Sequence, residues 1–173
     1  MAKSTIRTVR IDEDLNQAIE KVARQDKTSV NYVVNSAIRE AVEWTTVIPK
    51  LGFATFPKYI TDKLLDRLTD EECEALGRQI GREFLKPFVE YRFEKPTFED
   101  YIETIREFAK YTGQFKVLTK SRGEGKFVLI LEHGSGAKWS HLYKGTGEYA
   151  LNPPLAKNKT IELTDSHLII TFS

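Results

Sequence analysis

The sequence predicts an α+β protein with a small N-terminal β-α-α unit and a larger C-terminal domain whose helices pack on an antiparallel sheet. Three patterns predict this fold class. Apolar and polar residues alternate near the N-terminus, apolar residues then recur at helical spacing, and the pattern becomes extended after Gly113. Helices followed by strands are typical of an α+β layer. We expect domains over 1–44 and 60–173, joined by a connector over 45–59 that packs rather than acting as a loose tether.

The first element is a short strand over 8–11. Val9 and Ile11 share one face, and Thr8 and Arg10 share the other. Two amphipathic helices follow, one from Asp12 or Glu13 to Gln25 and one opening at Thr28 or Ser29. A unit this small cannot bury its own apolar faces, so we expect it to fold as a dimer. The predicted dimer core is Val9, Ile11, Leu15, Ile19, Val22, Val30, Val34 and Ile38.

The order, spacing and lengths of these elements resemble the ribbon-helix-helix superfamily of DNA-binding proteins, which includes Arc-, MetJ- and CopG-like repressors. The resemblance covers about residues 5–44 and rests on T-V-R-I-D-E-D-L at 8–15, the first-helix apolar positions, the Asp26-Lys27 turn and the second-helix start at 28–31. It implies that two chains pair their strands into an antiparallel ribbon that enters the DNA major groove. No such resemblance marks the second domain.

The outward face of this ribbon would carry Ile6, Thr8 and Arg10, which we predict to contact bases. Arg10 can hydrogen-bond a guanine edge bidentately, Thr8 can donate, accept or touch a thymine methyl, and Ile6 offers only apolar contact. The second helix presents free backbone amides at its N-terminus, which suit a phosphate oxygen. The predicted phosphate contacts are Lys3, Lys27, Thr28, Ser29, Val30 and Asn31.

Composition limits the function classes. The chain has 173 residues, a formal charge of +1 and one cysteine, Cys73, which excludes a polybasic coat protein and a disulfide framework. The first 44 residues hold seven basic and seven acidic side chains, so DNA attraction must come from a local stripe. Without an apolar run of membrane length or a signal peptide, we expect a cytoplasmic, nucleoid-associated protein that does not bind membranes.

The second domain begins after Pro49, Gly52 and Pro57 interrupt helical periodicity. We expect helices over 60–68, from a capping box at Thr69 and Glu72 until Pro87 ends or kinks the helix, and from a Thr97–Asp100 cap to Gly113. Two hairpins should follow: 115–120 with 126–132 through the turn 121–125, and 160–163 with 167–172 through 164–166. A short helix around 137–143 lies between them.

The stretch 131–141 is the most distinctive part of the second domain, because it joins glycines, histidines and an indole in one strand-to-helix turn. It is a candidate site for an effector or partner, formed by His133, Gly134, Ser135, Gly136, Trp139 and His141. The alternative is a tight turn that needs glycine for its backbone, with Trp139 as a core anchor. No close histidine pair has metal-ligand spacing, so we expect no metal and no cofactor.

These patterns together favour a sequence-specific transcriptional regulator. We expect a homodimer or dimer of dimers that binds double-stranded DNA, with a second domain that senses a ligand or mediates assembly. One alternative is an antitoxin that represses its own operon through a folded partner-binding domain. Another is an enzyme or interaction module tethered to DNA, although phosphate-loop, dinucleotide-binding and G-x-S-x-G motifs are absent from the sequence.

Overall fold

The computed structural model describes residues 5–54, 56–121, 127–151 and 158–172. The chain divides into two compact units, Met1–Ala54 and Thr55–Ser173. The boundary lies inside the predicted connector, 45–59. Of the helices in the described ranges, none is long and apolar enough to span a lipid bilayer.

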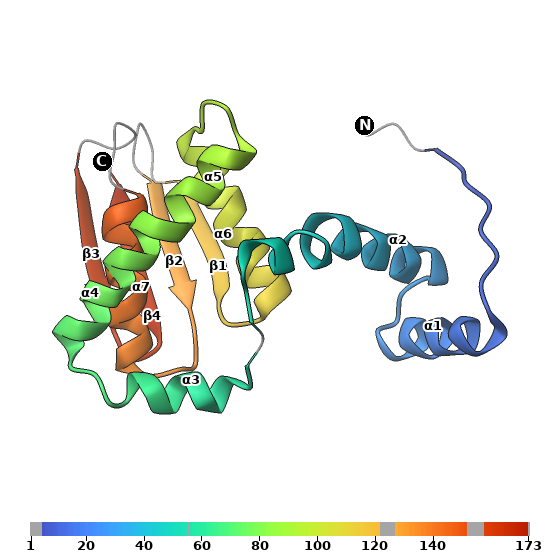
Figure 1. The fold of residues 1–173 in the computed structure, drawn as a ribbon, viewed down its shortest axis with the longest axis horizontal. Helices are drawn as coiled ribbons and strands as arrows, with labels where there is room; N and C mark the ends of the chain where they lie inside the picture. Colours follow the sequence, from blue (N-terminus) through green and yellow to red (C-terminus); the bar gives the residue numbers. More distant parts are fainter. Residues whose placement is uncertain (1–4, 55, 122–126, 152–157, 173) are drawn as a thin grey trace. The chain divides into compact units, whose positions relative to one another are not determined.

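Unit 1 contains two α-helices, α1 (Glu13–Gln25) and α2 (Val30–Glu40), followed by a π-helical turn η1 (Ala41–Thr45) and a 3-10 turn η2 (Ile48–Leu51) (Figure 1). Both predicted helices are confirmed. Glu13 and Asp14 lie in the first turn of α1, where the helix dipole favours negative charge. Ser29 caps α2, since its hydroxyl accepts a hydrogen bond from the Tyr32 backbone N–H at 3.1 Å.

The turn between α1 and α2 is a Schellman motif. The backbone N–H of Thr28 donates to the carbonyl of Ala23 at 2.9 Å, and that of Lys27 donates to the carbonyl of Arg24 at 3.3 Å. Lys27 has a φ of 51°, the left-handed conformation that glycine normally supplies at this position. A lysine therefore occupies a backbone position that is strained for any residue with a Cβ.

The predicted strand over 8–11 is wrong for the single chain, in which residues 5–12 form no strand. Figure 1 shows this segment as an extended trace that leads into α1. The physical reason is that a strand needs backbone partners for its N–H and C=O groups. The predicted ribbon takes those partners from a second chain, so the ribbon-helix-helix arrangement remains a proposal.

Unit 2 holds the remaining helices. They are α3 (Lys58–Leu65), α4 (Asp70–Ile80), the π-helical turn η3 (Gly81–Leu85), α5 (Lys86–Arg92), α6 (Phe98–Thr112) and α7 (Ala137–Ala150). Both predicted capping boxes, at Thr69 with Glu72 and at Thr97 with Asp100, are confirmed. Gly113, with a φ of 64°, ends α6 as expected. The first of these helices lies slightly before its predicted range of 60–68.

Two helix predictions need correction. Of the two alternatives predicted for Pro87, an end or a kink of its helix, the end is wrong, because the helical backbone continues through η3 and α5 to Arg92. Proline lacks an N–H and its ring clashes with the carbonyl four residues earlier. The π-helical turn η3 ends at Leu85, two residues before Pro87, so the regular α-helical bonding is already interrupted there. The predicted short helix over 137–143 instead runs to Ala150. Its glycines continue the helix because tertiary packing at Gly145 and Gly147 outweighs their low helix propensity.

The sheet has four antiparallel strands: β1 (Lys116–Ser121), β2 (Phe127–Glu132), β3 (Lys159–Leu163) and β4 (His167–Phe172). Their order is β1-β2-β4-β3, so both predicted hairpin pairings are confirmed. The turn predicted over 121–125 lies outside the described residues except for Ser121. Leu118, Ile130 and Ile169 lie opposite one another across β1, β2 and β4.

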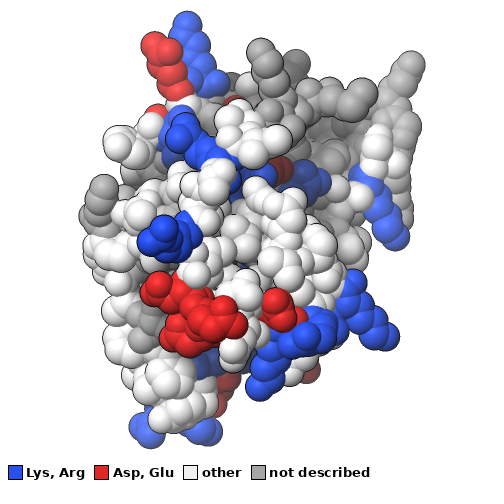
Figure 2. Space-filling model, turned by 90° about the vertical axis from the view of Figure 1, so that its right-hand side faces the viewer, with Lys and Arg blue, Asp and Glu red and all other residues white. Residues whose placement is uncertain are grey.

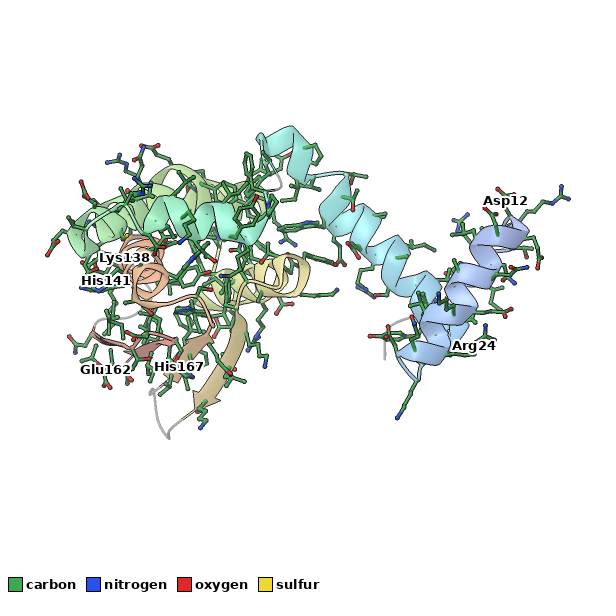
Figure 3. The ribbon with its side chains drawn as sticks, turned by 90° about the horizontal axis from the view of Figure 1, so that it is seen from below. Asp12, Arg24, Lys138, His141, Glu162 and His167 are labelled. Atoms are coloured by element: carbon green, nitrogen blue, oxygen red, sulfur yellow. The ribbon has the colours of Figure 1, made fainter. Side chains whose placement is uncertain are left out.

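The core of unit 2 lies between the helices and one face of this sheet, as expected for an α+β layer. The helices lie on one side of the strands in Figure 3. Leu129 on β2 and Leu168 on β4 are fully buried and pack with Ile102 and Ile105 on α6. Next to this core, α4 and α7 pack closely and enclose Cys73, Trp139 and Leu142.

Candidate functional site

The apolar faces of unit 1 lie open in the single chain. Of the side chains in this unit that the structure describes, only that of Ala23 is buried. Val9 is 62% exposed, and Leu15 and Ile38 are each 55% exposed. Val22 and Val30 are also exposed, while Ile11, Ile19 and Val34 are half-buried. The eight residues of the predicted dimer core thus remain available to a partner.

The predicted DNA-contacting residues are also accessible. Ile6, Thr8 and Arg10 are exposed, and so are Lys27, Ser29, Val30 and Asn31, while Thr28 is half-buried. Lys3 lies outside the described residues. Lys27 and Ser29 flank the turn that begins α2, so the structure brings these predicted phosphate contacts together at one helix end. Figure 2 shows basic and acidic side chains interspersed with uncharged ones on one face of the molecule.

His133 follows β2 and is buried, with 4% of its surface exposed. Its Nε2 lies 2.9 Å from the Ser140 hydroxyl, and that hydroxyl donates its one hydrogen to the carbonyl of Thr164. Ser140 must therefore accept from His133, which places the imidazole proton on Nε2. Burial lowers the pKa of His133, with the nearby His167 and Lys58 adding to the effect.

His141 belongs to an ion-pair network between α4 and α7. Its Nδ1 lies 2.8 Å from Glu74 Oε1 and its Nε2 lies 3.4 Å from Asp70 Oδ2. Lys138 donates to Asp70 and Lys144 donates to Glu74, each at 2.7 Å. Figure 3 labels Lys138 and His141 on the same helix, α7. The hydrogen bond from Lys138 lowers the pKa of Asp70 against a smaller opposing effect of burial. Burial is the largest single influence on Glu74 and raises its pKa, but the bonds to Lys144 and His141 together outweigh it, so the pKa of Glu74 is lowered.

Trp139 is buried and joins α7 to α3. Its indole Nε1 donates to Asp62 Oδ1 at 2.7 Å, and Lys58 donates to the same carboxylate at 2.8 Å and 2.9 Å. The hydrogen bond from Lys58 and that from Trp139 lower the pKa of Asp62. Trp139 also contacts the ring of Tyr143, with centroids 5.5 Å apart.

The structure does not bring the six residues of the predicted effector turn into one surface cleft. His133 and Trp139 are buried, Gly134 and Gly136 are exposed, and His141 is held by carboxylates. Gly136 has a φ of 87°, which agrees with the alternative interpretation of a strand-to-helix turn that needs glycine. Among these six residues, Trp139 alone lines the cavity described next.

A cavity of about 300 Å³ lies inside unit 2, between the helices and the sheet. Residues of η3, α6 and α7 line its helical side, and residues of β2 and β4 line its sheet side. The lining includes Phe84, Ile105, Phe108, Leu129, Trp139, Tyr143, Thr146 and Ile170. The sequence did not predict this cavity, because its lining residues come from elements far apart in the chain.

The hydroxyl of Tyr143 is a buried polar group on a residue that lines this cavity. Its ring lies against Phe115, His133 and Trp139. Its hydroxyl is enclosed from solvent and forms no hydrogen bond within the described ranges. Burial raises the pKa of this hydroxyl, and the nearby Asp62 carboxylate adds to the effect.

The described residues contain no cluster of three or more His, Cys, Asp or Glu side chains arranged to hold a metal ion. Cys73 is buried, and burial raises the pKa of its thiol. Comparison with protein-family models, with curated proteins and with solved structures gives no match to this chain. The ribbon-helix-helix resemblance therefore rests on the residues of the N-terminal segment.

Proposed function

We propose that this protein is a homodimeric, sequence-specific DNA-binding regulator whose second unit senses a small ligand. Residues 5–12 of two chains would pair into an antiparallel ribbon that lies in the DNA major groove. Arg10 and Thr8 would contact base edges from its outer face, with Ile6 beside them. The helices α1 and α2 of the two chains would enclose a shared apolar core.

The observation that carries this proposal is the exposed apolar face of unit 1. An isolated unit in which Leu15 and Ile38 are each more than half exposed has too little buried surface to fold by itself. An apolar face of this kind marks an interaction site, and a second copy offers the same residues in self-complementary form. The unpaired segment before α1 needs a backbone partner for the same reason.

The start of α2 supports a phosphate contact. Free backbone N–H groups at a helix N-terminus and the helix dipole attract an anion, and Lys27 stands beside them. Lys27 adopts a left-handed backbone conformation in which glycine would be less strained. Strained residues often cluster at functional positions, and here the strain positions a cationic side chain next to the helix end.

Ligand sensing is supported by the cavity in unit 2. A volume of about 300 Å³ reaches the lower end of the range occupied by small-molecule sites. In such a regulator, a ligand changes DNA binding when it binds one of two protein conformations more tightly than the other and only one of them binds DNA well.

Selection of bound DNA from a random pool tests the proposed function. A homodimeric ribbon predicts enrichment of a repeat with two related half-sites, because the protein's two-fold symmetry is copied in the operator. The Arg10→Ala variant should lose this enrichment while remaining folded. Recovery of unenriched DNA by wild-type protein at moderate salt would overturn the proposal and favour a toxin-binding or enzymatic role instead.

A further inference from the structure

The cavity in unit 2 is almost entirely apolar. Among the residues that the structure describes, those lining the cavity include no Asp, Glu, Lys, Arg or His. Two lining hydroxyls already donate to their own helix: Thr112 to the carbonyl of Phe108 at 2.6 Å and Thr146 to that of Leu142 at 2.9 Å. A charged group placed inside would lose its hydration without gaining a counter-charge, so the cavity selects against ions.

Its size sets an upper limit on the ligand. An apolar cavity of about 150 Å³ lined by Leu, Ile and Phe stays dry and holds a benzene molecule. The cavity here, at about 300 Å³, has roughly twice that volume. It therefore matches a molecule about as large as two fused rings.

The walls favour an aromatic occupant. Phe84 and Phe108 meet edge to face with centroids 5.7 Å apart, and Phe115 and Tyr143 do so at 5.2 Å. All four rings line the cavity, together with the indole of Trp139. Aromatic rings attract one another in offset and edge-to-face geometries beyond the gain from apolar burial alone.

The most exposed residues of the cavity lining lie at the end of α6 and mark its mouth. Thr112 and Gln114 are the lining residues that are also exposed, and they flank Gly113, where the helix ends. Gln114 carries an amide that can both donate and accept a hydrogen bond. A polar substituent on the ligand would stay hydrated at this mouth or bond to that amide, while the ring system enters the apolar interior.

We propose that this cavity binds an uncharged aromatic molecule of about two fused rings, whose single polar group lies at the mouth near Thr112 and Gln114. Its role as an effector of DNA binding rests on the proposed function. Binding itself does not, because it is measured on the full chain without DNA. A failed binding test would remove the ligand class and leave the DNA-binding proposal standing.

Titration calorimetry on the full chain tests the ligand class with three probes that share one ring system: naphthalene, 2-naphthol and 2-naphthalenesulfonate. We expect naphthalene and 2-naphthol to bind at one site per chain. The sulfonate should bind at least tenfold more weakly, because at the mouth it loses part of its hydration and the described lining residues offer it no positive charge in return. Equal binding of the sulfonate, or no binding of 2-naphthol with a Kd below about 1 mM, would overturn the proposal.

Two variants locate the site. Ile105→Phe adds a ring to a buried cavity wall and should weaken 2-naphthol binding at least tenfold. Leu118→Phe makes a similar change on β1, where the side chain is 47% exposed and does not line the cavity, and should leave binding unchanged. Ile105 is buried, so its substitution also tests the core. Gln114→Trp therefore serves as a second variant: it obstructs the mouth from an exposed position and should also weaken binding. Unchanged binding in Gln114→Trp and in folded Ile105→Phe would place the probe elsewhere and overturn the assignment.

Discussion

The backbone of α7 lies against Gly77 of α4 so closely that a Cβ at Gly77 would stand 2.1 Å from the carbonyl oxygen of Leu142. The contact is reciprocal, since a Cβ at Gly145 would stand 2.1 Å from the carbonyl oxygen of Glu74. Two helices thus meet backbone to backbone through glycines on both sides. This approach holds Trp139 and Leu142 in the small core beneath α4 and lets Glu74 reach His141 and Lys144.

We predict that Gly77→Ala destabilises the protein by about 1–3 kcal/mol, because the new methyl group forces α4 and α7 apart. Chemical denaturation followed by circular dichroism measures the effect. Gly134→Ala is the matched control, since a Cβ there has nothing within 4 Å, and it should change the free energy of unfolding by less than about 0.5 kcal/mol. Equal stability of the two variants would contradict the close packing.

Helix caps and strands could be predicted from the sequence, whereas the close contact of α4 and α7 through their glycines could not. Local signals predicted the helix caps at Thr69 and Thr97, a cap for α2 at Thr28 or Ser29, and the strands of the sheet, because caps and extended patterns depend on neighbours in the chain. The close approach of α4 and α7 depends on residues about 70 positions apart. Gly145 and Gly147 gave only a local signal, low helix propensity, and that signal wrongly favoured an early end to α7.

We predict that Tyr143→Phe stabilises the protein by about 1 kcal/mol, because it removes an enclosed hydroxyl that forms no hydrogen bond within the described ranges. The phenyl ring keeps the contacts with Phe115 and Trp139. Thermal and denaturant unfolding of the two proteins measure the difference. A loss of stability of similar size would indicate that the hydroxyl has a partner after all.

We predict that the free energy of unfolding falls as pH drops below about 6.5, partly because of His133. Burial lowers the pKa of His133 in the folded state, so the unfolded chain binds a proton there that the folded chain does not. Stability from this group is therefore complete above the unfolded pKa and is lost as pH falls toward the folded pKa. In His133→Gln, which keeps a donor for Ser140, this loss between pH 6.5 and 5 should be smaller. An identical pH dependence in both proteins would contradict the assignment.

We predict that Ile38→Asp abolishes the proposed dimer and leaves a monomer with a disordered unit 1, because the aspartate would place an unpaired charge in the proposed shared apolar core. Sedimentation velocity at micromolar concentration measures the oligomeric state, and circular dichroism measures the lost helix. Ala37→Asp is the control, since this neighbouring residue is exposed and outside the predicted core. A wild-type monomer with a folded unit 1 would exclude the shared core.

The candidate sites, like the fold, were predictable where they depend on neighbouring residues and not where they depend on distant ones. The predicted contacts near the start of α2 follow from a cap and a turn, and the structure places Lys27 and Ser29 together there. The effector turn was predicted from a concentration of chemically active residues, but Ser140 bonds Nε2 of His133, Glu74 bonds Nδ1 of His141 and Asp62 bonds the indole N–H of Trp139. Such partners come from other elements, so sequence reasoning could not see that these groups were already bonded.

Lys27 allows stability and DNA binding to be separated in one substitution. Asparagine tolerates the left-handed backbone conformation better than lysine does and carries no charge, so Lys27→Asn should leave the stability of unit 1 unchanged or slightly higher. If Lys27 neutralises one phosphate per chain, the variant dimer should bind all DNA sequences more weakly. The slope of log K against log salt should become shallower by about 1.8, or 0.9 for each phosphate lost. Lys21→Gln removes a charge from the exposed side of α1 at a residue that is not a predicted contact, and its slope should match that of wild type. A Lys27→Asn slope equal to that of Lys21→Gln would remove this end of α2 from the DNA interface, whatever the effect of either variant on stability.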